Sequence, residues 1–396
     1  MQTKALQKRS HLSLGISCTL MVAGTTIGAG MLGMPLATAK AGFWPAVGMT
    51  IMVWAFMLTT GLLLLEVCLK VPQGKNILSL SKYFWGNQGK GLIGSLFAFL
   101  YYCLLVAYFA AGSLLISSIF QLPSFISLVM FCLIFGGVVS LGPKWIDKVN
   151  FLLTLFMFST YALLIYWGGQ AVDLRKLTTC NMEASLLATP VLFSAFGYHN
   201  VIPSLANYVS GNKKVLRISL IAGTTIALIV FLLWQWIIIG SIPQDALGKT
   251  MQQGLPVTAA LQVVLGRPEI FIAGQCFAFF ALTTSLLGVC FSMVDFLAEI
   301  FHPNSRWNTK EFLTLCTFIP PFICVCLNPH IFDKALGVAG GIGEAFLNGF
   351  IPIAFFTLIK LKNDPLQKVA SKQWGLGILV VFCTLVFAVE VFDLFR

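Results

Sequence analysis

Long apolar runs alternate with short polar segments along almost the whole of this 396-residue chain. An apolar run of about 20 residues is long enough to cross a lipid bilayer as a helix. The pattern therefore predicts an all-α polytopic membrane protein, surrounded by membrane lipid, with almost no mass outside the bilayer. We expect eleven spans, at about residues 12–38, 43–69, 91–120, 124–141, 150–168, 186–209, 218–240, 270–301, 310–328, 332–359 and 373–395.

Two of these spans contain residues that break helices. The first span contains GTTIGAGMLGMP at 24–35, and the sixth contains FGYHNVIP at 196–203. Irregular backbone inside a bilayer is tolerated only where it is buried in protein or lines a water-filled cavity. Broken helices in corresponding halves of a multi-span protein are typical of secondary transporters. We therefore expect one domain over 1–396, with inverted repeats at about 12–168 and 186–359 and an extra span at about 373–395.

Composition strengthens the membrane prediction and bears on the partners of the protein. Hydrophobic residues make up 58% of the chain and charged residues 10%, whereas an ordinary soluble domain has roughly 25% charged residues. The net charge of +11 would suit a nucleic-acid partner, but most of the 25 Lys and Arg residues fall in alternate loops. Basic residues favour cytoplasmic loops. We therefore expect no nucleic-acid partner, a cytoplasmic N-terminus and an external C-terminus.

The motifs give no support to ATP hydrolysis or to enzyme catalysis. GNQGKG at 86–91 lacks the spacing and the Ser/Thr of a Walker motif, so no ATPase subunit is implied. GAGMLG at 28–33 matches GxGxxG but lacks the strand and the acidic residue that a dinucleotide site needs. We expect neither an enzyme nor a cofactor. A passive channel or a structural membrane subunit remains the alternative of another class.

The chemistry of the two breaks suits a zwitterionic amino acid. Backbone amides near Ala29 and Gly30 would face a carboxylate, with the positive end of a helix dipole behind them. Carbonyls freed at Thr25 and Thr26, and others in the second break, would accept hydrogen bonds from an ammonium group. Neither break contains Lys, Arg, Asp or Glu. The predicted substrate-binding residues are Thr25, Thr26, Gly28, Ala29, Gly30, Tyr108, Phe193, Ala195, Phe196, Gly197, Tyr198 and His199.

Several of these residues also have a purely structural interpretation. Gly24 and Gly28 have the spacing of a close helix-packing seam. The abundant Phe residues would mostly face lipid or pack in the core. Tyr198 and His199 differ because both are polar and lie at a break, so we expect them to line the cavity. His199 could equally be a satisfied structural histidine or, less favoured, a proton carrier.

Coupling to an ion gradient has candidates in four spans. The hydroxyls of Thr284 and Ser285, with freed carbonyls of the first break, would suit a cation, although such hydroxyls often bond to their own helix. Buried carboxylates in membranes are candidates for proton coupling, and Glu66 and Glu344 are the two we consider. Glu66 lies near the cytoplasmic end of its span, where it could instead pair with loop lysines.

The two breaks, together with GLLLLEVCL at 61–69 and ALTTSLLGV at 281–289, resemble the hydroxy/aromatic amino acid permease family of the amino acid–polyamine–organocation superfamily. The resemblance covers essentially the whole chain and is greatest to tyrosine-specific and tryptophan-specific permeases. It implies a LeuT-like 5+5 inverted repeat with discontinuous spans one and six, and proton symport across the bacterial inner membrane. The residues that would correspond to the sodium site of relatives are Gly24, Ile27, Ala281, Thr284 and Ser285.

These lines of reasoning lead to one expected function. We expect a secondary active importer of an aromatic amino acid, tyrosine first and tryptophan second, coupled to H⁺ and possibly to Na⁺. The only metal expected is that possible sodium. Alternating access would rock spans one, two, six and seven against spans three, four, eight and nine. A sodium-coupled permease or a serine/threonine permease is the alternative within transporters.

Overall fold

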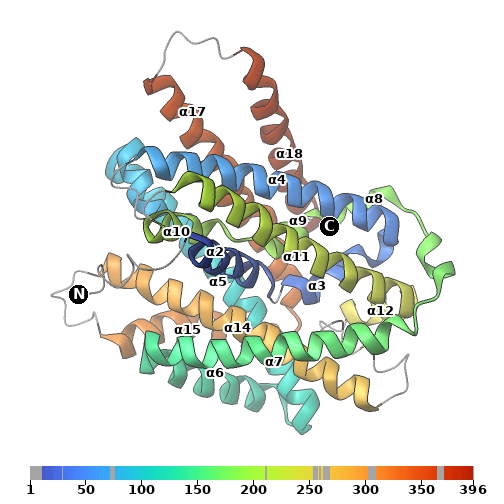
Figure 1. Ribbon diagram of the computed structural model, residues 1–396. Coiled ribbons are helices and arrows are strands. Elements are labelled where there is room, and N and C mark those ends of the chain that lie inside the picture. The colour runs from blue at the N-terminus through green and yellow to red at the C-terminus, as the bar shows by residue number, and fades with distance from the viewer. Residues whose placement is uncertain are drawn as a thin grey trace.

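The computed structural model describes residues 11–28, 30–71, 76–209, 212–252, 257, 260–261, 268–301, 309–363 and 370–395. Within these residues the chain is helical and has no strand (Figure 1). Among them, nine helices are long and apolar enough to cross a membrane. The bent pair α2 and α3, counted as one, adds a further span, which is the first in the chain. The predicted sixth span consists of two short helices, α9 and α10. The predicted all-α, multi-span architecture is therefore confirmed.

The unbroken spans follow the hydrophobic pattern closely. They are α4 (Phe43–Lys70), α5 (Ile77–Phe120), α6 (Ser124–Leu141), α7 (Pro143–Gly169), α11 (Lys213–Ser241), α14 (Pro268–Ile300), α15 (Lys310–Leu327) and α18 (Ala370–Leu394). The tenth span runs from α16 (Phe332–Val338) through the π-helix η4 (Ala339–Phe350) into α17 (Ile351–Asn363). Short helices in the connections are η1 (Ala39–Ala41), η2 (Leu174–Thr178), α8 (Met182–Leu187) and α12 (Gln244–Gln252).

Span three begins earlier than the hydrophobic pattern predicts. Helix α5 starts at Ile77 behind a capping box, in which Asn76 and Ser79 bond reciprocally. The helix then bends at Gly86, whose φ of 67° is accessible to glycine at little cost. Residues 77–90, which precede the predicted start of span three, therefore belong to the same helix as that span.

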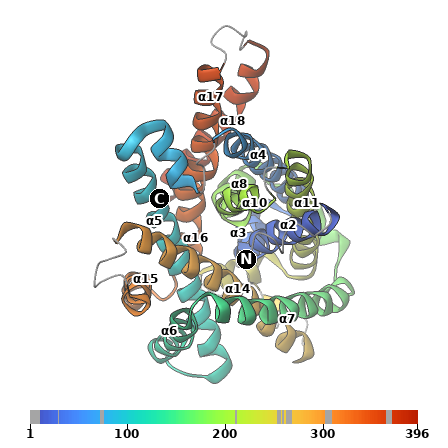
Figure 2. The same ribbon diagram turned by 60° about the vertical axis from the view of Figure 1, so that its left-hand side comes forward.

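The helices pack into two groups, the first formed by spans one, two, six and seven and the second by spans three, four, five, eight and nine. In one group, α11 packs against both α2 (His11–Thr26) and α4, while α10 (Ile202–Tyr208) packs against α4 and α3 (Gly30–Thr38) against α9 (Thr189–Ala195). In the other group, α14 packs against α5 and α7, and α15 packs against α5 and α6. Figures 1 and 2 both show α2 and α3 between α4 on one side and α14 on the other.

The tenth span packs closely through its glycines. Helix η4 contacts α5, α9 and α18. A Cβ added at Gly343 would lie 2.8 Å from Leu100 Cδ1, and one at Gly340 would overlap the carbonyl oxygen of Pro190. On the other side, the Sγ of Cys383 in α18 lies 2.9 Å from the carbonyl oxygen of Ala345. The glycines thus bring η4 close to the sixth span, and the eleventh span covers it.

Candidate functional site

The first span breaks where the sequence predicts. Helix α2 ends at Thr26, α3 begins at Gly30, and their axes differ by 53°. The hydroxyls of Thr25 and Thr26 bond back to the carbonyls of Met21 and Val22, both at 2.8 Å. Their hydroxyls are therefore occupied by hydrogen bonds to carbonyls of the preceding turn of α2. Any contact of these threonines with a substrate would come from their backbone groups. Ala29, predicted to bind substrate, lies outside the described residues.

The second break lies between α9 and α10. Helix α9 ends at Ala195, and the N–H of Phe196 is shared between the carbonyls of Leu192 and Phe193 at 3.2 and 3.1 Å. A 3-10 turn, η3 (His199–Val201), follows before α10 begins. Pro203 in the first turn of α10 suits that position because its missing N–H would have no partner within the helix.

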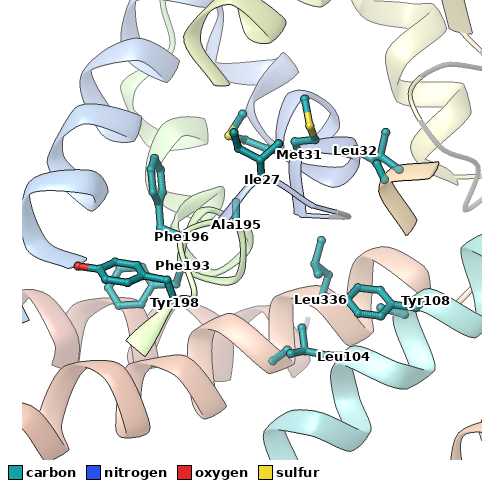
Figure 3. Close-up of a cluster of buried hydrophobic side chains, with 14 of the residues drawn as sticks. Ile27, Met31, Leu32, Leu104, Tyr108, Phe193, Ala195, Phe196, Tyr198 and Leu336 are labelled. Carbon is teal, nitrogen blue, oxygen red and sulfur yellow. The ribbon is translucent and has the colours of Figure 1, made fainter. Parts of the chain in front are cut away.

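The two breaks touch each other directly. A Cβ added at Gly30 would lie 2.6 Å from the Cα of Ala195 and 3.1 Å from its backbone nitrogen. In Figure 3, Ala195 lies between Ile27 and Met31 of the first span and the neighbouring Phe196. Only a residue without a side chain at position 30 allows this backbone-to-backbone approach.

Spans three and eight reach the first break through two hydroxyl groups. A Cβ added at Gly28 would overlap Ser285 Oγ of α14. The Ser285 side chain is in turn hydrogen-bonded to Tyr108 of α5. Figure 3 shows Tyr108 and Leu104 facing the broken helices from the side of α5. The structure thus brings together four residues predicted to bind substrate, Gly28, Gly30, Tyr108 and Ala195, and Ser285 of the predicted cation site.

Tyr198 and His199 point toward span two rather than toward Tyr108. The Tyr198 hydroxyl donates to the carbonyl of Met57 at 3.2 Å, and His199 Nε2 lies 2.9 Å from Thr60 Oγ1. Both side chains are buried, and the Tyr198 hydroxyl occupies the space that a Cβ at Gly61 would need. In Figure 3 the Tyr198 ring points away from Tyr108. The expectation that these two residues line the substrate cavity gains no support from this placement.

Tyr198→Phe is therefore expected to affect stability rather than substrate recognition. The variant loses one buried hydrogen bond, which is worth about 0.5–1.5 kcal/mol of unfolding free energy. The KM for the transported substrate should stay unchanged, because the hydroxyl faces Met57 in α4. Thermal unfolding and initial uptake rates measure the two effects separately. A large rise in KM without loss of stability would contradict this placement.

The aromatic residues Phe193 and Phe196 pack inside the first group of helices. The Phe193 ring lies 5.1 Å from that of Phe56, and the Phe196 ring lies edge-on to Phe231 at 4.9 Å. Both are fully buried. They surround the second break as expected, and much of their surface is already covered by α4 and α11.

The proposed cation residues are only partly assembled. Thr284 Oγ1 bonds to its own helix, at 2.9 Å from the carbonyl of Phe280 and 3.1 Å from that of Ala281. Gly24 is exposed, and a Cβ added there would meet nothing within 4 Å. Ile27 and Ala281 are buried. Ile27 lies within the first break, and Ser285 reaches that break from α14, with its Oγ against Gly28.

The two carboxylates considered for proton coupling lie in opposite environments. Glu66 pairs with Lys213 at 2.5 Å and with Arg217 at 3.2 Å. This is the ion pairing that the sequence indicates as the alternative to proton coupling. Glu344 is 4% exposed, lies on the π-helix η4, and accepts a hydrogen bond from the amide of Asn348. Its carboxylate carbon would lie 3.0 Å from a Cβ at Gly197. The structure thus places Glu344 directly against the second break.

Sequence reasoning missed one polar contact between the two groups of helices. Asn200 Nδ2 donates to the Tyr101 hydroxyl at 2.9 Å and so joins η3 to α5. The sequence shows that Asn200 is a polar residue within an apolar span. It does not show that Tyr101 is the partner, because the break interrupts the helical period and Tyr101 lies about a hundred residues earlier in the chain. Tyr101 is buried, which shields its end of this hydrogen bond from solvent.

The geometry defines a multi-span helical fold with two discontinuous helices, and comparison with solved structures agrees. The structure of MhsT in complex with L-phenylalanine matches with a TM-score of 0.63 at 15% identity, covering 95% of this chain and 98% of that chain. This similarity shows the LeuT-like fold. Residues 13–391 match the tryptophan/tyrosine permease family. The chain therefore belongs to that family of multi-pass membrane permeases, which transport amino acids and are not enzymes.

Individual relatives share moderate identity over most of their length. The tyrosine-specific transport system 1 of Haemophilus influenzae is 30% identical, with 94% of each chain covered. The tryptophan-specific transport protein of the same organism is 28% identical, over 96% of this chain and 94% of the relative. The glutamine transporter 2 of Aliivibrio fischeri is 30% identical, over 87% of this chain and 89% of the relative.

Proposed function

We propose that the protein is a secondary active importer of an aromatic amino acid in the bacterial inner membrane. The observation that carries the proposal is the contact between the two breaks, where Gly30 lies against the backbone of Ala195. Backbone N–H groups at the start of α3 attract the substrate carboxylate, and carbonyls at the end of α2 accept hydrogen bonds from its ammonium group. Transport proceeds by alternating access around this site.

An aromatic side chain is the preferred cargo, with tyrosine first and tryptophan second. The names of the tyrosine and tryptophan relatives support this choice, as does the aromatic ring of Tyr108, which faces the broken helices from α5. Glutamine is the second candidate, because the glutamine transporter relative is as similar in identity as the tyrosine system. The polar groups of Tyr108 and Ser285 suit either a phenol or an amide.

A proton is the coupling ion in this proposal, and Glu344 carries it. Among the described residues, the ion pairs involve other carboxylates, of Glu66 and Glu299. An ionised carboxylate buried without a positive partner is costly, so burial of Glu344 favours its protonated form. Opening of the site to water favours release of the proton. Because Glu344 lies against Gly197, movement of span six changes its surroundings directly.

The orientation in the membrane follows from the charges of the loops. The N-terminus is cytoplasmic and the C-terminus external, since basic residues concentrate in the loops that this orientation places inside. Lys213 and Arg217, which pair with Glu66 at the junction of α4 and α11, then lie on the cytoplasmic side.

Uptake of labelled tyrosine by reconstituted proteoliposomes tests the proposed function. We expect accumulation under an inward proton gradient, with strong competition by unlabelled tryptophan and weak competition by glutamine and serine. Accumulation under a sodium gradient alone would contradict proton coupling. Uptake that responds to neither gradient would contradict symport, and stronger competition by glutamine than by tryptophan would contradict the aromatic preference.

A further inference from the structure

We propose that Trp234 of span seven is a positioning residue that fixes the outer half of the first broken span, by replacing a hydrogen bond that Pro35 removes. This inference rests on the proposed function, since it concerns how the site at Gly30 is held in place. Nothing in the family match assigns a role to this tryptophan.

The need for such a bond arises inside α3. Pro35 lies within this helix and has no N–H group, so it cannot donate to the carbonyl of Met31 four residues earlier. Met31 is fully buried, and a buried carbonyl without a donor is strongly unfavourable. The indole Nε1–H of Trp234 donates to this carbonyl at 3.0 Å. The span-seven side chain thus supplies the donor that the helix itself lacks.

The indole is held firmly from its other side. Its ring lies 5.1 Å from Phe277 of α14 and 6.2 Å from Tyr161 of α7. Tyr161 is itself fixed, because its hydroxyl donates to the carbonyl of Val230 at 2.7 Å. Trp234 is fully buried among these rings. A donor so constrained determines where Met31, and hence Gly30 one residue before it, lies relative to α11.

Two neighbouring residues of α11 extend the same arrangement. Gln235 Nε2 donates to Thr38 Oγ1 at 3.3 Å, and Gln235 Oε1 accepts from Thr50 Oγ1 at 3.2 Å. Phe231, one turn before Trp234, packs edge-on against Phe196 at the second break. One side of α11 therefore contacts both broken spans. Its side chains hold the two breaks in the relative position at which Gly30 meets Ala195.

Trp234→Phe and Pro35→Ala, alone and combined, test the inference. Trp234→Phe keeps a ring but removes the donor, and loss of one buried hydrogen bond should weaken tyrosine binding about tenfold and lower the unfolding temperature. Pro35→Ala restores an N–H four residues after Met31. The double variant should therefore recover both the binding affinity and the unfolding temperature, whereas Pro35→Ala alone should change little.

Trp236→Phe is the matched control. Trp236 lies two residues after Trp234 in α11, and its indole lies against Gly169 of α7 rather than against the first span. This variant should leave both readouts unchanged with or without Pro35→Ala.

A double variant as defective as Trp234→Phe, or Trp234→Phe indistinguishable from the parent protein, would overturn the inference. If the parent protein bound no tyrosine, the proposed substrate would fail, and the unfolding temperatures of the same variants would still decide the role of Trp234. If Trp234→Phe did not fold, recovery of folding in the double variant would support the inference, and failure to recover would overturn it.

Discussion

Gly30→Val is expected to abolish tyrosine binding while the protein still inserts into the membrane. The first added carbon would lie 2.6 Å from the Cα of Ala195, and a backbone atom cannot move aside as the end of a flexible side chain can. Overpacking by this one carbon costs about 1–3 kcal/mol, which corresponds to roughly fivefold to 150-fold in affinity. The two further carbons of valine would in addition occupy space between the breaks. Equilibrium binding of labelled tyrosine to purified protein measures the effect.

Gly48→Val is the matched control for this prediction. Gly48 is an exposed residue of α4, and a Cβ added there meets nothing within 4 Å. The control should bind tyrosine normally. Gly30→Ala should already weaken binding, because the clash with Ala195 involves the Cβ alone. Normal binding by Gly30→Val would show that the contact between the two breaks is not where the substrate binds.

Glu344→Gln is expected to lose uptake driven by a proton gradient by more than about tenfold, since proton-driven accumulation needs a group that binds and releases the proton. Glutamine has nearly the same shape, so its carbonyl oxygen can still accept from the Asn348 amide and lie against Gly197. It cannot ionise. Exchange of internal for external tyrosine, which needs no net proton movement, should continue. Comparison of gradient-driven uptake with exchange separates the two processes.

Glu66→Gln distinguishes a specific role of Glu344 from a general effect of removing a carboxylate near the transport path. Glu66 is paired with Lys213 and Arg217 at the edge of the membrane, and a pair in such a place typically contributes about 0–1 kcal/mol. Its variant should keep gradient-driven uptake. Loss of coupling in Glu66→Gln together with normal coupling in Glu344→Gln would reverse the assignment of the proton carrier.

The spans and their two interruptions could be predicted because each depends on local chemistry. Runs of apolar residues determine where the chain crosses the membrane, and the Gly and Pro residues around Gly30 and Pro203 prevent a continuous helix at the predicted places. The start of α5 was harder to predict. Its first part is amphipathic rather than uniformly apolar, and it joins the rest of the helix through Gly86.

The directions of side chains at the breaks could not be predicted for a physical reason. A helical period tells which residues share a face, but no period continues through the residues after Phe196. Tyr198 and His199 could therefore be placed at the break but not on the side that contacts Met57 and Thr60. The hydroxyl of Thr284 had two open interpretations, and the structure shows its bond back to the preceding turn.

The environment of Glu344 depends on contacts between distant parts of the chain. The sequence shows a carboxylate among glycines, but the π-helix around it forms against other spans. Gly340 approaches the carbonyl of Pro190, and Gly343 approaches Leu100. π-Helices are rare and frequently mark functional sites. No local pattern predicts them, because the close approaches that surround them come from residues of spans three and six.

The position of bound tyrosine in an experimental structure tests the central claim most directly. The account predicts an amino acid between the two breaks, with its carboxylate at the first backbone N–H groups of α3 and its ammonium group at the carbonyls that end α2. It also predicts that both interruptions persist when the site is occupied. Tyrosine bound elsewhere, or spans one and six that continue as unbroken helices around it, would contradict the account.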